Sequence, residues 1–174
     1  SLLMASLPFA VTLGVLPYVV RIEKFLVTLQ GGSELAAVFH VAQLAWLAGL
    51  VVPAALRAAL LPVLGEARGS PLRVRQALDT SLDLCMGLLP IGLIGGYMVV
   101  ALLAPVAFPS EYFDETFGAS AVDLFIVMLL GWALTLLATP TYTAVMTSFN
   151  PWRFTGFIFI VLLFAIAIGY VAII

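Results

Sequence analysis

Three charged residues, Arg21, Glu23 and Lys24, follow twenty uncharged residues and precede a second apolar stretch. If Gly31 and Gly32 form a turn between two helices, Arg21 lies ten residues before it, about 15 Å along a helix. That depth is near the middle of a hydrocarbon core about 30 Å thick, where an unpaired charge costs at least about 2.5–3.5 kcal/mol. The cluster is therefore either an anion-binding group or a structural group in which Glu23 neutralises Lys24.

Polar residues also interrupt the apolar stretch that follows, in "VFHVAQLAWL" and at Arg57. His40 and Gln43 are three residues apart, so they share one face of a helix. Counted from the same turn, Gln43 is level with Arg21 and His40 with Lys24, so we expect a polar track that suits an anion. The alternatives are a hydrogen-bonded core histidine, an amide that joins two helices, and an Arg57 side chain that extends to the head groups.

Two carboxylates, Asp79 and Asp83, are four residues apart at the start of the third expected span. We expect them to lie near a helix N-terminus, where the helix dipole favours negative charge, and to pair with Arg73 or Arg75. The alternative is a role in ion coupling, which Glu23 would share. Asp123 has the same N-terminal placement before the fourth span.

The composition indicates a membrane protein. Apolar residues make up 64% of the chain, charged residues 9%, and the mean hydropathy is +1.21. A soluble domain has about 25% charged residues, whereas about 20 consecutive apolar residues suffice for a transmembrane helix. We expect an all-α, polytopic transmembrane bundle of about five spans, forming a single region over residues 1–174. The approximate spans are 2–30, 34–64, 77–109, 119–149 and 152–174.

The loop arginines predict the orientation of these spans. Arg68, Arg73 and Arg75 lie in the expected loop 65–76, and Arg153 lies between the last two spans. Because Lys and Arg concentrate in cytoplasmic loops, loop 65–76 is predicted to be cytoplasmic and the C-terminus to lie outside. The apolar ends further suggest that the chain is part of a larger protein.

No enzyme signature is present in the sequence. The chain has one His and one Cys, no GxxxxGK phosphate loop and no GxSxG elbow. A basic soluble surface for nucleic acid is also missing, and no cofactor or metal is expected. We expect Cys85, in the third span, to be a small buried apolar residue. The glycines of "IGLIGG" (residues 91–96) are expected to permit close helix packing.

Several segments resemble the multidrug/oligosaccharidyl-lipid/polysaccharide exporter superfamily, in particular its polysaccharide and lipid-linked oligosaccharide flippases. The similar segments are Arg21-Ile22-Glu23-Lys24, Pro53-Ala54-Ala55-Leu56, Leu61-Pro62-Val63-Leu64, Pro90 and Phe108–Tyr112. The resemblance implies the C-terminal half of a transporter of about twelve to fourteen helices. Its implied activity is the alternating-access transfer of a polyprenyl-pyrophosphate-linked oligosaccharide across the bacterial cytoplasmic membrane.

This function assigns a hypothetical role to each polar residue of the spans. Arg21, Lys24 and Arg57 would hold the anionic head group, while His40 and Gln43 would bind polar sugar or head-group atoms. The remaining half of the transporter or a partner chain would complete the pathway, with membrane lipid around it. The alternatives are a cation-coupled multidrug exporter of the same superfamily and a non-transporting membrane scaffold subunit.

Overall fold

The computed structural model describes residues 27–29, 31–67, 69–114, 119–148, 155–156, 159–160 and 163 of the 174-residue chain. Two compact units divide the chain: residues 1–36 with 148–174, and residues 37–147. In the first unit the described residues outside α4 are all helical. The second unit contains the helices that can be analysed by their packing.

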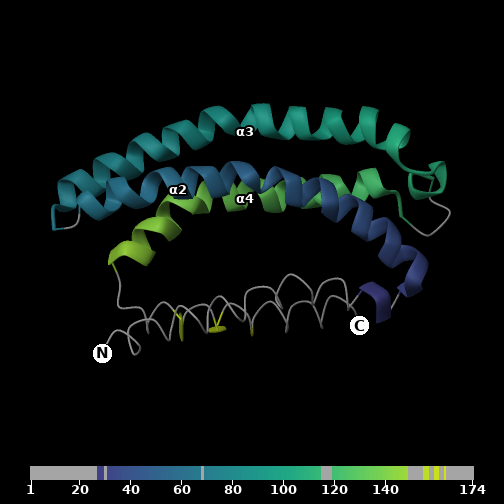
Figure 1. Ribbon diagram of the computed structural model, residues 1–174, viewed down its shortest axis with the longest axis horizontal. Helices are drawn as coiled ribbons and strands as arrows, with labels where there is room; N and C mark the ends of the chain where they lie inside the picture. Colours follow the sequence, from purple (N-terminus) through teal and green to yellow (C-terminus); the bar gives the residue numbers. More distant parts are fainter. Residues whose placement is uncertain are drawn as a thin grey trace. The chain divides into compact units, whose positions relative to one another are not determined.

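Every long element in the described part of the chain is an α-helix (Figure 1). A helix over residues 31–49 passes through Leu50 into α2 (Val51–Glu66), and α3 covers Pro71–Ala107. The short 3-10 helix η1 (Ser110–Tyr112) precedes α4 (Ala121–Ser148). The predicted all-α class is confirmed for the described residues.

Three of the described helices are long and apolar enough to cross a membrane. They are Gly31–Glu66, Pro71–Ala107 and Ala121–Thr147, and they fit a multi-pass membrane protein. They overlap the expected spans 34–64, 77–109 and 119–149. The expected spans 2–30 and 152–174 fall almost entirely outside the described residues.

The connection between α2 and α3 is shorter than the expected loop 65–76. Gly65 and Glu66 still belong to α2, and α3 already begins at Pro71. Pro71 fits there because the first helical turn needs no intrahelical donor. Gly69 has a φ of +98°, a left-handed conformation that glycine adopts without steric cost. The arginines at 73 and 75 are therefore helical.

The start of α4 follows helix-capping rules. The Ser120 hydroxyl accepts a hydrogen bond from the Val122 backbone N–H at 3.2 Å, which satisfies one of the free donors of the first turn. Asp123 lies in that first turn, where the helix dipole favours its charge. The N-terminal placement expected for Asp123 is confirmed.

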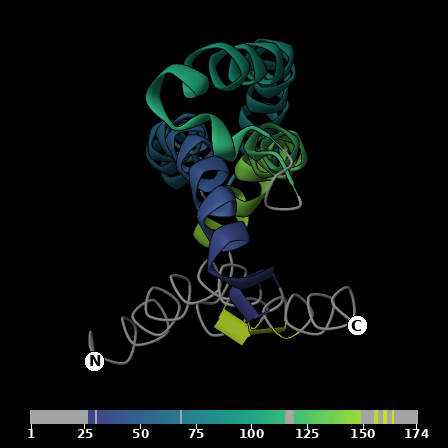
Figure 2. The ribbon, with the colours of Figure 1, turned by 90° about the vertical axis from the view of Figure 1, so that its right-hand side faces the viewer.

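The long helices of the second unit lie side by side, as the end-on view shows (Figure 2). One apolar cluster joins Ala42 of helix 31–49 and Val100 of α3 to Phe125 and Leu129 of α4. A second cluster packs Leu60 and Leu64 of α2 against Ala144 of α4. These clusters form a thin core along the length of the helices.

The outer faces of these helices are apolar rather than polar. Val106 is 85% exposed, Leu72 71% and Leu134 69%. Exposed apolar surface of this extent is incompatible with water as the surrounding solvent but suits lipid. The exposure pattern therefore agrees with the membrane class that the composition predicted.

Two glycines of α3 bring this helix close to α4. A Cβ built on Gly92 would lie 2.6 Å from Cζ3 of Trp132, and one on Gly96 would lie 3.1 Å from Cδ2 of Leu129. The two positions are four residues apart, which is the spacing of a GxxxG packing motif. The expectation that residues 91–96 permit close helix packing is confirmed.

We predict that Gly92→Ala destabilises the protein by about 1–3 kcal/mol, because the added methyl group overlaps the Trp132 indole. Gly87→Ala is the matched control, since a Cβ at Gly87 meets nothing within 4 Å. The control should be neutral or slightly stabilising, by up to about 1 kcal/mol. Thermal unfolding of the detergent-solubilised variants checks both. Equal midpoints would contradict the proposed close packing.

Candidate functional site

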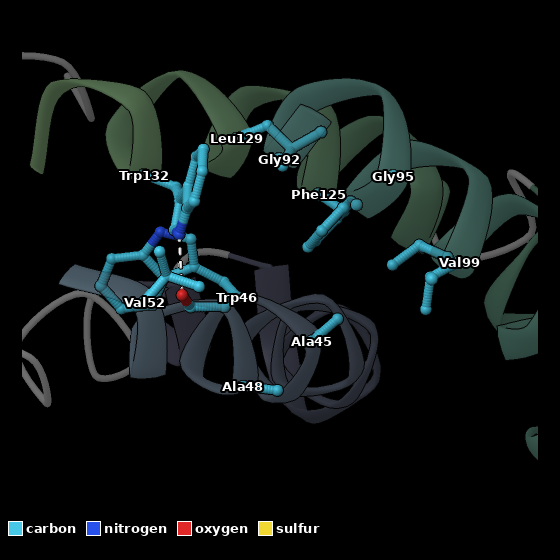
Figure 3. Close-up of a pocket in the computed structure, with 13 residues that line it drawn as sticks. Ala45, Trp46, Ala48, Val52, Gly92, Gly95, Val99, Phe125, Leu129 and Trp132 are labelled. Atoms are coloured by element: carbon cyan, nitrogen blue, oxygen red, sulfur yellow. Dashed lines mark hydrogen bonds between the residues drawn. The ribbon is translucent and has the colours of Figure 1, made fainter. Parts of the chain in front are cut away.

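The second unit contains an apolar cavity of about 290 Å³ between helix 31–49, α2, α3 and α4 (Figure 3). Trp46 and Trp132 lie at one end, and Val99 lies at the other. Phe125 and Leu129 form the wall on α4. The cavity is just below the size of about 300–1,000 Å³ that is usual for small-molecule sites.

One of the glycines that line this cavity faces open space. The lining includes the glycines Gly49, Gly92, Gly95 and Gly96. At Gly92 and Gly96 the space of the absent side chain is taken by α4, whereas a Cβ at Gly95 meets nothing within 4 Å. The open volume is therefore a notch of side-chain width rather than a gap as wide as a helix.

A hydrogen bond between two helices closes one end of the cavity. The Trp132 indole N–H donates to the carbonyl of Gly49 at 2.8 Å (Figure 3). That carbonyl lies four residues before Pro53, which has no backbone N–H to offer it. Trp132 thus supplies, from α4, the donor that the proline removes from the neighbouring helix.

The same arrangement recurs between α3 and α4. Pro140 leaves the Leu136 carbonyl without its helical donor. The Cys85 thiol, which is fully buried, donates to that carbonyl at 3.4 Å. Cys85 is the small buried residue that the sequence predicted, and it also serves as a weak hydrogen-bond donor.

The predicted polar residues of helix 31–49 lie at the edge of this core. Gln43 is buried and His40 is half-buried. His40 Nδ1 is inaccessible and has no hydrogen-bond partner among the described residues, and the same holds for the Trp46 indole N–H. Because buried polar atoms are normally paired, each of these requires a partner beyond the described part of the chain.

Arg57 does not join His40 and Gln43 in one site. It lies fourteen residues after Gln43, about 21 Å along the helix axis, and it is exposed. Among the described residues of the predicted polar track, His40 and Gln43 therefore lie together and Arg57 lies apart from them.

The acidic pair of α3 differs from the expectation. Because α3 begins at Pro71, Asp79 is its ninth residue and Asp83 its thirteenth, beyond the first turn in which the helix dipole acts. The expected N-terminal placement is wrong for both. Asp79 does contact Arg75, at 3.8 Å, in a pair with side chains 66% and 84% exposed. Exposed pairs of this kind contribute little to stability.

The charged cluster Arg21, Glu23 and Lys24 lies outside the described residues, so its anion-binding and charge-pairing roles stay predictions. Among the residues that are described, no group of three or more His, Cys, Asp or Glu side chains could hold a metal ion. The cavity carries no acid, base or nucleophile, so its chemistry is limited to apolar binding.

The cavity was missed by the sequence analysis, although part of its signal was present. Gly92 and Gly96 were interpreted only as packing residues, and Trp46 and Trp132 were not connected to them. Neither a family model, nor a curated protein, nor a solved structure matches this chain. The comparisons therefore add no identity to the class of multi-pass helical membrane protein.

We predict that Trp132→Phe destabilises the protein by about 1–3 kcal/mol, because it leaves the Gly49 carbonyl without a donor. Pro53→Ala restores a backbone N–H at position 53, so the same change should cost less in that background. A double-mutant cycle of unfolding free energies should give a coupling of about 1 kcal/mol or more.

The control for this cycle is Trp46→Phe, which removes an indole N–H that has no partner in the described part of the chain. It should show no coupling to Pro53→Ala. Equal coupling for the two tryptophans would mean that the Trp132 hydrogen bond does not compensate for the proline.

We further predict that Cys85, the single cysteine of the sequence, resists a membrane-permeant maleimide until the protein unfolds. The thiol is fully buried between α3 and α4, and packs with Trp132 and Leu136. Mass spectrometry of the labelled protein, with and without denaturant, measures the protection. Rapid labelling of the folded protein would contradict this packing.

Proposed function

We propose that this chain is the C-terminal part of a transporter that moves a polyprenyl-pyrophosphate-linked oligosaccharide outward across the bacterial cytoplasmic membrane. It would work by alternating access, with about five spans, the connection between α2 and α3 in the cytoplasm and the C-terminus outside. No catalytic residue is required, because the substrate is moved without covalent change.

The observation that carries the proposal is the unsatisfied His40 Nδ1 in a helix that is otherwise apolar and long enough to span a membrane. An ionisable group within a membrane span is costly and usually marks a substrate or ion pathway. Gln43 lies one helical turn away and is buried, so a second polar group is available beside it. A polar substrate atom would satisfy His40 where the described residues do not.

Positive charge on the same helix supports an anionic substrate. Arg57 lies within the candidate span Gly31–Glu66, nine residues before its end. Arg21 and Lys24 add cationic side chains ahead of that span. A diphosphate carries several acceptor oxygens that guanidinium groups bind well, and the resemblance around residues 21–24 and 53–64 suggests the same class of substrate.

The acidic residues argue against a cation-coupled multidrug exporter. Such a protein would favour carboxylates deep in the spans, yet Glu34 and Glu66 lie near the ends of the candidate span Gly31–Glu66, whereas Arg57 lies well inside it. A non-transporting scaffold subunit is the other alternative. It predicts that neutralising the polar residues of the spans leaves the function of the membrane complex unchanged.

We predict that outward transfer of a lipid-linked oligosaccharide in reconstituted vesicles is lost with Arg21→Gln and reduced with His40→Phe. Removal of a charged hydrogen bond weakens binding by about 1.5–3 kcal/mol, or about ten- to hundredfold. His40→Phe retains a planar ring, so it tests the imidazole rather than the packing. The measurement uses the full-length parent protein.

The matched control is Arg75→Gln, which also removes an arginine but at an exposed surface pair. It should transport normally. If both Arg21→Gln and His40→Phe still transfer the substrate, the flippase function would stand, but Arg21 and His40 would have only a structural role. No transfer by the unmodified protein would favour the drug exporter or the scaffold.

A further inference from the structure

We propose that the apolar cavity between helix 31–49, α2, α3 and α4 holds one acyl chain of a membrane phospholipid. This bound lipid would be a structural ligand of the helix bundle, distinct from any transported molecule. The proposal does not rest on the transport function.

The cavity lies at the depth of the hydrocarbon core of the membrane. Ala45 and Val52 line it, and they lie fourteen residues from the start and the end of the candidate span Gly31–Glu66, respectively. The cavity is therefore at the centre of a span that crosses a hydrocarbon core about 30 Å thick. A lipid chain is the molecule present at that depth in the highest concentration.

The lining is almost entirely apolar, and the one polar group in it without a partner among the described residues is the Trp46 indole N–H. Its side chains are Ala, Val, Leu, Phe and Trp, with four glycines between them. The Trp132 N–H that reaches this region is already used by the Gly49 carbonyl. A sugar or phosphate placed here would lose most of its hydrogen bonds to water without replacement, whereas a hydrocarbon chain would gain dispersion contacts that an empty notch forfeits.

The cavity is also accessible from the lipid side. Val52 is 40% exposed and Val99 is 55% exposed, and both line the cavity (Figure 3). Since a Cβ at Gly95 meets nothing within 4 Å, the notch there has room for an unbranched chain. A whole helix, about 10 Å in diameter, would instead need the surrounding helices to separate.

Gly95 offers a direct test, because it lines the cavity and a Cβ added there meets nothing within 4 Å. The full-length protein is reconstituted into phospholipid vesicles that contain a phospholipid with a mid-chain diazirine. After irradiation, adducts are mapped by peptide mass spectrometry. The residues to compare are Trp132, only 5% exposed and reached through the cavity, and Leu103, 60% exposed on the outside of α3.

In the unmodified protein we expect adducts on both Trp132 and Leu103. Gly95→Leu should remove most of the Trp132 adduct and leave the Leu103 adduct unchanged, and Gly95→Ala should give an intermediate loss. Gly87→Leu is the matched control, because Gly87 is on the same helix, is equally open and does not line the cavity. It should label like the unmodified protein.

Two results would overturn the proposal. One is a Trp132 adduct that is as abundant in Gly95→Leu as in the unmodified protein. The other is an absence of any Trp132 adduct while Leu103 is labelled, which would mean that another protein segment fills the cavity. Protection of Cys85 from maleimide, measured on the same samples, verifies that each variant is folded.

Discussion

A backbone carbonyl that loses its helical donor to a proline must find another donor, and in hydrocarbon no water can supply it. Two such carbonyls in the described spans receive a donor from a neighbouring helix. The Gly49 carbonyl, freed by Pro53, receives the indole N–H of Trp132, and the Leu136 carbonyl, freed by Pro140, receives the Cys85 thiol. Both bonds run between helices, so each joins α4 to a neighbouring helix close to a proline.

Close approach is what makes these bonds possible, and glycine is what permits the approach. The Trp132 indole lies against Gly49, where a Cβ would be 3.3 Å from its Nε1, and against Gly92 of α3. The same absence of side chains leaves the notch at Gly95 open. Glycines therefore line both the tight contacts of Trp132 and the open part of the cavity.

The all-helical membrane class and the positions of the helices could be predicted from the sequence, because both depend on the hydrophobicity of each segment alone. Three expected spans agree with the helices to within a few residues, apart from the start of α3 at Pro71. The start of α3 was missed because Ser and Pro are common in loops, and both residues are also common at the first positions of a helix. The placement of Asp79 and Asp83 failed for the same reason.

The hydrogen bonds between helices could not be predicted, since they depend on residues far apart in the chain. Trp132 and Gly49 are 83 positions apart, and nothing local to either indicates the other. A proline in a span does indicate that a carbonyl four residues earlier needs a donor. It does not indicate which helix supplies that donor, because rotation and depth of the helices are set by packing.

Polar residues in a span are informative only when their own helix does not satisfy them. The hydroxyls of Thr135, Thr139 and Thr143 donate to carbonyls four residues earlier at 2.7–2.8 Å, so their polarity is absorbed within α4. Their presence in an apolar helix therefore requires no ligand and no partner.

His40 and Trp46 differ from the threonines in this respect. Each hides a nitrogen that has no partner among the described residues, and neither side chain can reach its own helical carbonyls as a threonine hydroxyl does. Both lie on helix 31–49, within two turns of one another. The two buried side-chain nitrogens without a partner among the described residues thus lie on one helix, and none lies on α3 or α4.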